Sequence, residues 1–253
     1  MRITFLGTGT SQGVPVIGCD CRVCRSEDSR DKRLRTSVHV FHQQKSFVID
    51  TGPDFRQQML RENILDLDFV LFTHHHKDHV AGMDDIRSYN FRSKRALPIY
   101  AGFDTLLQLK AEFPYVFSPQ GYGGAPRVEV NEIQNNPFRA GNIDVIPVEV
   151  FHHKLPVLGF RIGDFAYITD ASCIPEKEME KIINVKMLVI NALQKTPHMS
   201  HFTLNEALLE IKKINPGMAY ITHISHGMGC HETVCRELPQ NVSLAYDGLK
   251  IDL

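Results

Sequence analysis

The sequence predicts an α/β fold in which two mixed sheets pack face to face with helices outside them, a layered αββα sandwich. Short apolar runs rich in β-branched and aromatic residues predict strands, and amphipathic runs between several of them predict helices. The predicted strands come first in pairs and later alternate with helices, which favours two sheets over one doubly wound sheet. With 253 residues, 43% of them hydrophobic, the chain can bury such a core as one domain spanning residues 1–253.

The predicted strands are short apolar runs, namely Ile3 to Leu6, Ser37 to Phe41, Phe47 to Asp50, Phe69 to Thr73, Ile143 to Val150, Phe165 to Thr169, Met187 to Asn191 and Met218 to Thr222. The clearest predicted helices cover Asp54 to Glu62, Asp104 to Glu112, Pro175 to Ile183 and Thr203 to Ile214. The last one opens with Thr203-x-x-Glu206, the pattern of a capping box. Glycine and proline interrupt nearly every step from Ser118 to Pro126, which predicts a loop, either a mobile lid or a plain connection.

The charge balance and the N-terminal segment bear on where the protein works. The formal net charge is -1, with 28 basic and 29 acidic residues, so no overall field attracts nucleic acid or an anionic membrane. The N-terminal apolar stretch lacks the basic leader and cleavage site of a signal peptide. No run approaches the roughly 20 apolar residues that cross a bilayer. We expect a soluble, cytoplasmic protein.

A cluster of metal-binding residue types follows the apolar strand predicted at Phe69 to Thr73. The segment from His74 to His79 reads H-H-H-K-D-H and contains the pattern H-x-H-x-D-H. Ligands at alternate positions project to one side of an extended turn, and Asp78-His79 opens a predicted helix, so the donors converge. Imidazole and carboxylate groups suit divalent first-row metals. The pattern therefore predicts a site that two metal ions can share.

This motif resembles the signature of the metallo-β-lactamase superfamily, whose fold is the αββα sandwich. The resemblance covers essentially the whole chain. In that family the later ligands are a histidine after a strand, a bridging aspartate and a histidine near the C-terminus. This chain has His152, Asp170 and His223 in that order.

The resemblance implies two catalytic ions and assigns a ligand set to each. One ion would be bound by His74, His76 and His152, the other by Asp78, His79 and His223, with Asp170 bridging them. His75 and His153 are the adjacent alternatives; spacing favours His76, and only the resemblance favours His152. The ions would be zinc or manganese, with iron as a further choice, because nitrogen and oxygen donors discriminate poorly among these metals. Asp50 would either orient a ligand histidine or form a turn.

Three cysteines lie close together in Cys19-x-Cys21-x-x-Cys24. Without an export signal, this spacing favours a tetrahedral zinc site that lacks its fourth ligand over disulfides. The sequence is similar to one branch of the superfamily, the cyclic phosphodiesterase of the carbon-phosphorus lyase pathway. There such a cluster is completed by a histidine three residues after the last catalytic ligand, which is His226 here. Rival fourth ligands are Cys230, His231 and Cys235.

The resemblance to this branch also implies the chemistry. A hydroxide bridging two metals would attack a small, cyclic phosphodiester in line with the leaving alkoxide, and Asp78 would be essential for turnover. The branch places its general acid at the position of His201, and a protonated histidine can supply a proton to the alkoxide. A surface-loop role is the alternative for His201 and for His198. Leu6 to Ser11 and Gly82 to Arg87 also resemble segments of this branch.

Rival functions and partners remain open at this level. A tRNA 3'-processing endonuclease shares the fold and ligands, but the only segment here for its tRNA-clamping arm is Asn90 to Gly124, with a short basic run. A carboxyl-ester, thioester or lactam hydrolase, or a non-catalytic metal-binding scaffold, could use the same fold. Cys173 and the segment Gly121 to Gly124 depart from the branch and leave the substrate open. We expect a small-molecule phosphodiester as the partner, neither membrane nor nucleic acid, and either a monomer or a homodimer.

Overall fold

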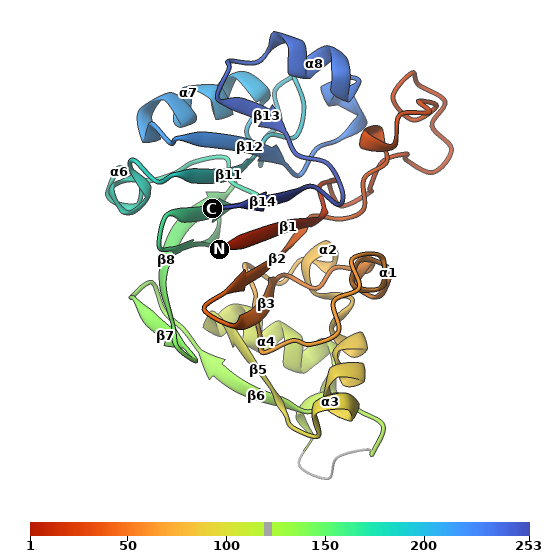
Figure 1. Ribbon diagram of the computed structural model, residues 1–253, viewed down its shortest axis with the longest axis vertical. Helices are drawn as coiled ribbons and strands as arrows, with labels where there is room; N and C mark the ends of the chain where they lie inside the picture. Colours follow the sequence, from red (N-terminus) through yellow and green to blue (C-terminus); the bar gives the residue numbers. More distant parts are fainter. Residues whose placement is uncertain (119–122) are drawn as a thin grey trace.

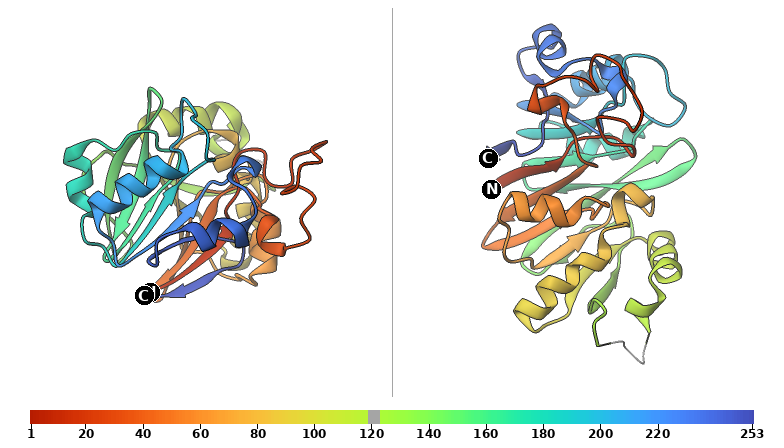
Figure 2. Two further views of the ribbon diagram at one scale, coloured as in Figure 1. Left: turned by 90° about the horizontal axis from the view of Figure 1, so that it is seen from above. Right: turned by 90° about the vertical axis from the view of Figure 1, so that its right-hand side faces the viewer.

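The computed structural model describes residues 1–118 and 123–253. Two sheets of seven strands each lie face to face, and helices cover their outer sides (Figure 1). The view from above in Figure 2 shows the sheets between two groups of helices. This arrangement confirms the predicted αββα sandwich.

The first sheet has the strand order β14-β1-β2-β3-β4-β5-β6. Its strands are β1 (Arg2–Gly7), β2 (Ser37–His42), β3 (Lys45–Ile49), β4 (Phe69–Leu71), β5 (Leu97–Ala101), β6 (Val128–Glu132) and β14 (Lys250–Asp252). The strands from β3 to β6 are parallel, with Phe47 opposite Phe69 and Val70 opposite Ile99. Their carboxyl ends therefore meet at one edge of the sheet.

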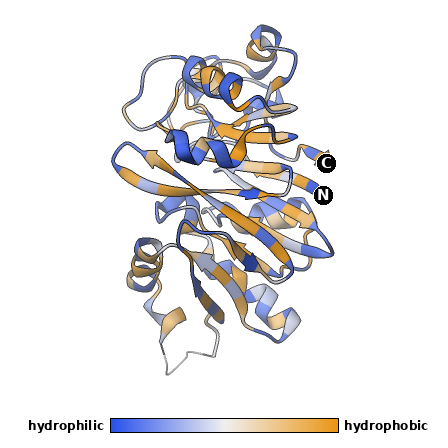
Figure 3. Ribbon diagram, turned by 90° about the vertical axis from the view of Figure 1, so that its left-hand side faces the viewer, coloured by the Kyte–Doolittle hydropathy of each residue, from blue (hydrophilic) through white to orange (hydrophobic). Residues whose placement is uncertain are grey.

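The second sheet has the order β13-β12-β11-β10-β9-β8-β7. Its strands are β7 (Phe138–Ala140), β8 (Ile143–His152), β9 (Leu155–Ile162), β10 (Phe165–Ile168), β11 (Met187–Asn191), β12 (Met218–Thr222) and β13 (Val242–Leu244). The strands from β10 to β13 are parallel, whereas β8 and β9 form a long antiparallel hairpin. Buried and less buried residues alternate along the first part of β8, and Figure 3 shows the matching bands of hydropathy.

Helices lie on both outer faces. They are α1 (Phe55–Arg61), α2 (Lys77–Val80), α3 (Arg87–Ser93), α4 (Phe103–Glu112), α5 (Pro114–Phe117), α6 (Glu176–Met179), α7 (Leu204–Ile214) and α8 (His231–Glu237). Short 3-10 helices cover Ser29–Asp31, Met83–Ile86, Glu180–Ile182 and His226–Met228. None of the helices in the described part of the chain is long and apolar enough to cross a membrane.

The buried apolar residues form one core between the sheets and one beneath each helical layer. Val189 and Phe69 belong to the central core. Ile190, the next residue on β11, faces the core under α7 instead, and Val70 on β4 faces the core under α4. Neighbouring residues on a strand point to opposite faces, so each sheet is apolar on both sides.

Several predicted boundaries shift for local reasons. The capping box of α7 is confirmed, because the Thr203 hydroxyl accepts from Glu206 N and the Glu206 carboxylate accepts from Thr203 N at 2.8 Å. The helix predicted from Pro175 to Ile183 is split into α6 and a 3-10 turn. The predicted lid or connection from Ser118 to Pro126 falls partly on residues 119–122, which lie outside the described residues.

Candidate metal centre

The predicted ligands come together where strands of both sheets end. His74 follows β4 in the first sheet, while His152 ends β8 and Asp170 and His223 follow β10 and β12 in the second. A strand end is held by the sheet but faces the loops, where side chains are free to converge.

Asp170 lies at the centre of this group. Its Oδ2 is 3.1 Å from His79 Nε2, and its Oδ1 is 3.3 Å from His223 Nε2. His79 Nε2 is also 3.3 Å from Asp78 Oδ2, and the donor atoms of these four buried residues all lie within 4.8 Å of one another. Asp170 also belongs to a second group of donor atoms, with His152 and His201, so its carboxylate lies close to residues predicted to bind both ions.

The remaining predicted ligands lie beside this group. His74 Nε2 is 3.0 Å from His76 Nδ1, and the rings of His76 and His152 are 5.1 Å apart. Burial lowers the pKa of His74 well below its ordinary value, which keeps the imidazole in the neutral form that binds metal. His153, by contrast, is exposed at the tip of the β8–β9 hairpin.

Hydrogen bonds fix the orientation of two of these histidines. The buried Asp50 carboxylate is 2.7 Å from His79 Nδ1 and accepts hydrogen bonds from Thr73 N and Thr73 Oγ1, both at 2.8 Å. The Ser200 carbonyl is 2.8 Å from His152 Nδ1. In each ring the other nitrogen, Nε2, is left for a ligand bond. Asp50 is therefore an orienting residue, and the Ser200 carbonyl could not be found from sequence because any residue type supplies one.

The donor set fits divalent cations. His79 Nε2 is buried and has no hydrogen-bond partner among the described residues, although it faces two carboxylates. Burial raises the pKa of Asp170, but the neighbouring His223 and His79 rings outweigh this effect and hold the pKa well below its ordinary value. A buried, ionised carboxylate beside an unpaired imidazole nitrogen is the arrangement that a shared cation stabilises.

The backbone at this centre is strained. Asp50, Asp170 and His223 have φ values of +67°, +58° and +55°. Side chains other than glycine rarely adopt this conformation, which costs on the order of 1–3 kcal/mol per residue and persists only where the surroundings enforce it. Gly52 is part of those surroundings, because a Cβ there would collide with the Asp78 carbonyl oxygen.

His201 lies next to the cluster. Its Nδ1 is 3.7 Å from Asp170 Oδ1, and its ring is 4.5 Å from that of His152. Burial, together with the charge of His223, lowers the pKa of His201 to about 3. His198 is exposed, with its ring 5.2 Å from that of His201.

The cysteine loop forms a second cluster with the predicted histidine. His226 Nδ1 lies 3.2 Å from Cys19 Sγ and 3.5 Å from both Cys21 Sγ and Cys24 Sγ. The donor atoms lie within 4.8 Å of one another, which fits the donor set of a tetrahedral zinc site. The backbone N–H of Cys24 lowers the pKa of the Cys21 thiol to about 6, which favours the thiolate that binds metal.

The rival fourth ligands are engaged elsewhere. Cys235 Sγ is 3.5 Å from His231 Nε2, and His231 Nδ1 is 3.2 Å from the buried Arg33 guanidinium. Cys230 packs against the cysteines but does not belong to the group of donor atoms. Cys173 is exposed, and its backbone forms an isolated antiparallel β-bridge with Phe151 on β8.

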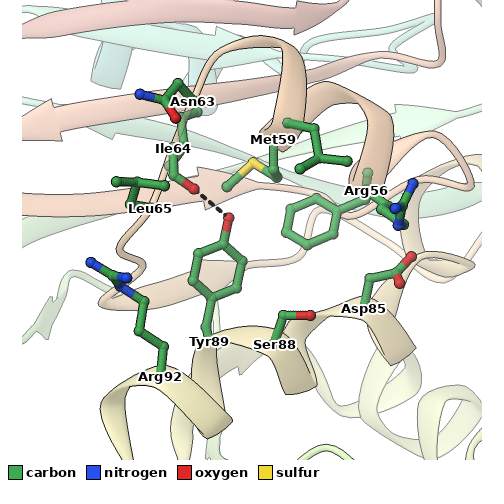
Figure 4. A pocket seen from close by; sticks show the side chains of 11 residues that line it. Arg56, Met59, Asn63, Ile64, Leu65, Asp85, Ser88, Tyr89 and Arg92 are labelled. Atoms are coloured by element: carbon green, nitrogen blue, oxygen red, sulfur yellow. Dashed lines mark hydrogen bonds between the residues drawn. The ribbon is translucent and has the colours of Figure 1, made fainter.

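An apolar pocket of about 310 Å³ lies away from these clusters, between α1 and α3 (Figure 4). Met59 and Leu65 line it, and the Tyr89 hydroxyl donates to the Ile64 carbonyl at 2.8 Å across it. None of the predicted metal ligands lines this pocket.

Comparison with known proteins shows the family. The model of the β-lactamase superfamily domain matches residues 45–224. A crystal structure described as a new diphosphatase from the PhnP family is 41% identical, with a TM-score of 0.93, and the match covers 99% of this chain and 97% of that one. The chain belongs to the PhnP family of the metallo-β-lactamase superfamily.

Two other relatives delimit what this membership shows. The Zn²⁺-bound PqqB of Methylobacterium extorquens has a TM-score of 0.82 over the full length of both chains, but at 19% identity it shows the fold alone. An octanoyltransferase of Porphyromonas gingivalis is 40% identical over 253 residues, which are 99% of this chain and 51% of the relative. The chain thus spans about half the length of that relative. This PhnP-family chain has a buried His/Asp cluster that suggests metal ions.

Proposed function

We propose that this PhnP-family protein is a dinuclear metal-dependent phosphodiesterase that hydrolyses a small, cyclic phosphodiester. The observation that carries the proposal is the position of Asp170, whose two carboxylate oxygens face His79 and His223 within a buried set of histidines and carboxylates. Two divalent ions in such a site lower the pKa of a water molecule and neutralise charge on phosphate oxygens.

The side chains around this centre have separate tasks. Asp50 holds His79 with Nε2 directed at the carboxylates, and Asp170 is shared between the group of Asp78, His79 and His223 and the group of His152 and His201. His201 lies beside them, which supports its assignment here as the proton donor to the leaving alkoxide. Burial keeps this ring neutral in the free protein, and the negative charge of a bound phosphate would favour the protonated form that a general acid needs.

A second candidate is hydrolysis of a P–O–P linkage. It is favoured because the 41% identical relative is described as a diphosphatase. Attack on a diester and attack on a diphosphate use the same metal centre and differ only in the leaving group. An acyl ester or thioester is the remaining alternative, since the half-length match to an octanoyltransferase leaves it open.

Metal analysis and turnover together test the proposal. Purified protein should contain about three ions per chain, two catalytic and one in the cysteine cluster. It should hydrolyse a 2',3'-cyclic nucleotide and bis(p-nitrophenyl) phosphate faster than a dinucleoside diphosphate or a thioester. Asp78→Ala should abolish turnover while the circular dichroism spectrum stays unchanged. Metal-loaded protein that cleaves only the diphosphate or only the thioester would replace the proposal by that alternative, and inactivity on all of them would favour a non-catalytic scaffold.

A further inference from the structure

A polar pocket of about 280 Å³ opens at the edge of the sandwich that carries the metal centre. Thr73, which lines it, precedes His74 in the chain, and Pro156, which also lines it, lies opposite Phe151 beside His152. The pocket extends across the carboxyl ends of β5 and β6, which are parallel to β4. The pocket wall thus contains the chain neighbour of His74 and the residue that pairs with the chain neighbour of His152.

The lining of this pocket is rich in hydrogen-bond acceptors. Asp104, Glu132 and Glu149 line it, and among the described residues no hydrogen bond or ion pair engages their carboxylates. No lysine or arginine of the described chain lines it. Because uncompensated carboxylates repel phosphate, this pocket is unsuited to a second phosphate group or to the backbone of a nucleic acid.

Two side chains of α4 add to this lining. Thr105 is only 6% exposed and adds a hydroxyl-bearing side chain to the polar wall of the pocket. Phe103 is 62% exposed although it is a large apolar side chain, and it flanks the pocket at the start of the helix. An exposed aromatic ring beside unpaired acceptors is suited to a flat, hydrogen-bonding ring system.

We propose that this pocket binds the nucleoside part of the substrate whose phosphodiester lies at the metal centre. The carboxylates accept hydrogen bonds from sugar hydroxyls and from the amino group of the base, as acidic side chains do in other nucleotide and base sites. The base stacks on Phe103. The pocket volume suits a single nucleoside rather than an oligonucleotide. This inference rests on the proposed function for the placement of the phosphate, but not for binding of the nucleoside itself.

The test compares three cyclic diesters of decreasing size on the metal-loaded protein. Adenosine 2',3'-cyclic phosphate carries a base and a sugar, glycerol 1,2-cyclic phosphate carries a hydroxyl but no base, and ethylene phosphate carries neither. Phe103→Ala should lower kcat/KM for the adenosine ester at least about 10-fold, mainly through KM, and should affect the two smaller esters far less. Glu149→Gln and Thr105→Val should lower kcat/KM for the adenosine and glycerol esters relative to ethylene phosphate. Leu107→Ala, on the same helix and 54% exposed but outside the pocket lining, is the matched control and should change none of the three.

Direct binding separates this inference from the proposed function. Calorimetry with adenosine as the probe should show binding to the parent protein that Phe103→Ala weakens and Leu107→Ala does not. Adenosine binding without turnover of any cyclic ester would support the pocket and contradict the phosphodiesterase. Turnover of all three esters with equal efficiency, or equal losses on all three in Phe103→Ala, would overturn the nucleoside pocket and leave the phosphodiesterase standing.

Discussion

The Asp50 carboxylate is in contact with two donors of Thr73 and with His79 at the same time. It is completely buried, and burial raises its pKa, so those donors are what hold it in place. At the scale of single residues, the precision of the centre depends on this contact and on the left-handed backbone of Asp50, Asp170 and His223. Because such backbone conformations persist only where the surroundings enforce them, they pre-organise these side chains for a ligand.

Asp50→Asn should weaken metal binding by about 10–100-fold, because an amide at this position cannot accept from all three donors at once. Calorimetric titration of metal into metal-free protein measures the effect. Asp144→Asn, at an exposed position of β8, is the control and should bind metal like the parent. Equal affinity in Asp50→Asn and the parent would show that His79 needs no such support.

His39→Gln should reduce the sensitivity of the fold to acid. Burial lowers the pKa of His39 from 6.5 to about 4, so the unfolded chain takes up its proton first as the pH falls. The free energy of unfolding contributed by the neutral ring is fully present above pH 6.5. It is lost progressively as the pH falls from 6.5 to about 4, and the loss is at most about 3 kcal/mol. Urea unfolding at pH 7 and pH 5 should give a smaller difference in the variant than in the parent.

His42→Gln is the comparison for this measurement, because His42 is on the same strand and its pKa is lowered less by burial. The variant should keep nearly the acid sensitivity of the parent. If both variants behave like the parent, some other group controls the response of the fold to acid.

At the scale of elements, α7 positions the segment that carries His201. Its N-cap, Thr203, comes two residues after His201, and Phe202 N donates to the Ala171 carbonyl next to Asp170. The start of the helix is therefore tied to both His201 and the segment of the central carboxylate. A helix whose first turn frays would release that segment.

Thr203→Ala should lower the free energy of unfolding by about 1 kcal/mol, because the hydroxyl that accepts the hydrogen bond from Glu206 N is lost. It should also lower kcat more than metal affinity, since His201 is displaced while the ligands are not. Thr233→Ala, at an exposed position within α8, is the control for removing a threonine from a helix. Unchanged stability in Thr203→Ala would contradict the role of the box.

At the scale of the whole molecule, residues 10–32 form a long loop segment, called the excursion below, that projects from the sandwich at the upper right of Figure 1. The apolar cluster in this excursion contains only Val14, Val23 and Cys24 as buried members. It is attached to the body through Cys19, Cys21 and Cys24 beside His226, which follows the same strand as His223. A metal in the cysteine cluster would therefore stabilise the excursion and the end of β12 together.

Cys21→Ser should destabilise the protein by more than about 3 kcal/mol, as loss of a metal site does, and should lower the metal content by one ion. Thermal unfolding with and without a strong chelator measures the effect, and the chelator should shift the parent more than the variant. Cys173→Ser, at an exposed cysteine outside the cluster, is the control. A melting temperature equal to that of the parent would exclude a structural metal.

The sequence could predict the features formed by residues close together in the chain, but not those formed by distant segments. The histidine motif and the Thr203 box lie within a few residues, so their geometry follows from strand and helix periodicity. The strands β5 and β9 contain Pro98 and Pro156, which disfavour a strand locally, and pairing on both sides, of β5 with β4 and β6 and of β9 with β8 and β10, determines them. The pocket proposed to bind the nucleoside joins segments from Thr73 to Leu158, which no local pattern relates.

The two ends of the chain touch, since Met1 N donates to the Leu253 carbonyl at 2.8 Å and β1 pairs with β14 (Figure 1). A linker of a few residues would close the backbone into a ring without moving either strand. New ends opened at the exposed Gln43–Gln44 turn would then give a circularly permuted chain with the same sheets. The order in which the strands follow one another is thus separable from their arrangement in the two sheets. Another protein could be fused at the natural ends or at the Gln43–Gln44 turn, and the candidate metal centre would stay accessible.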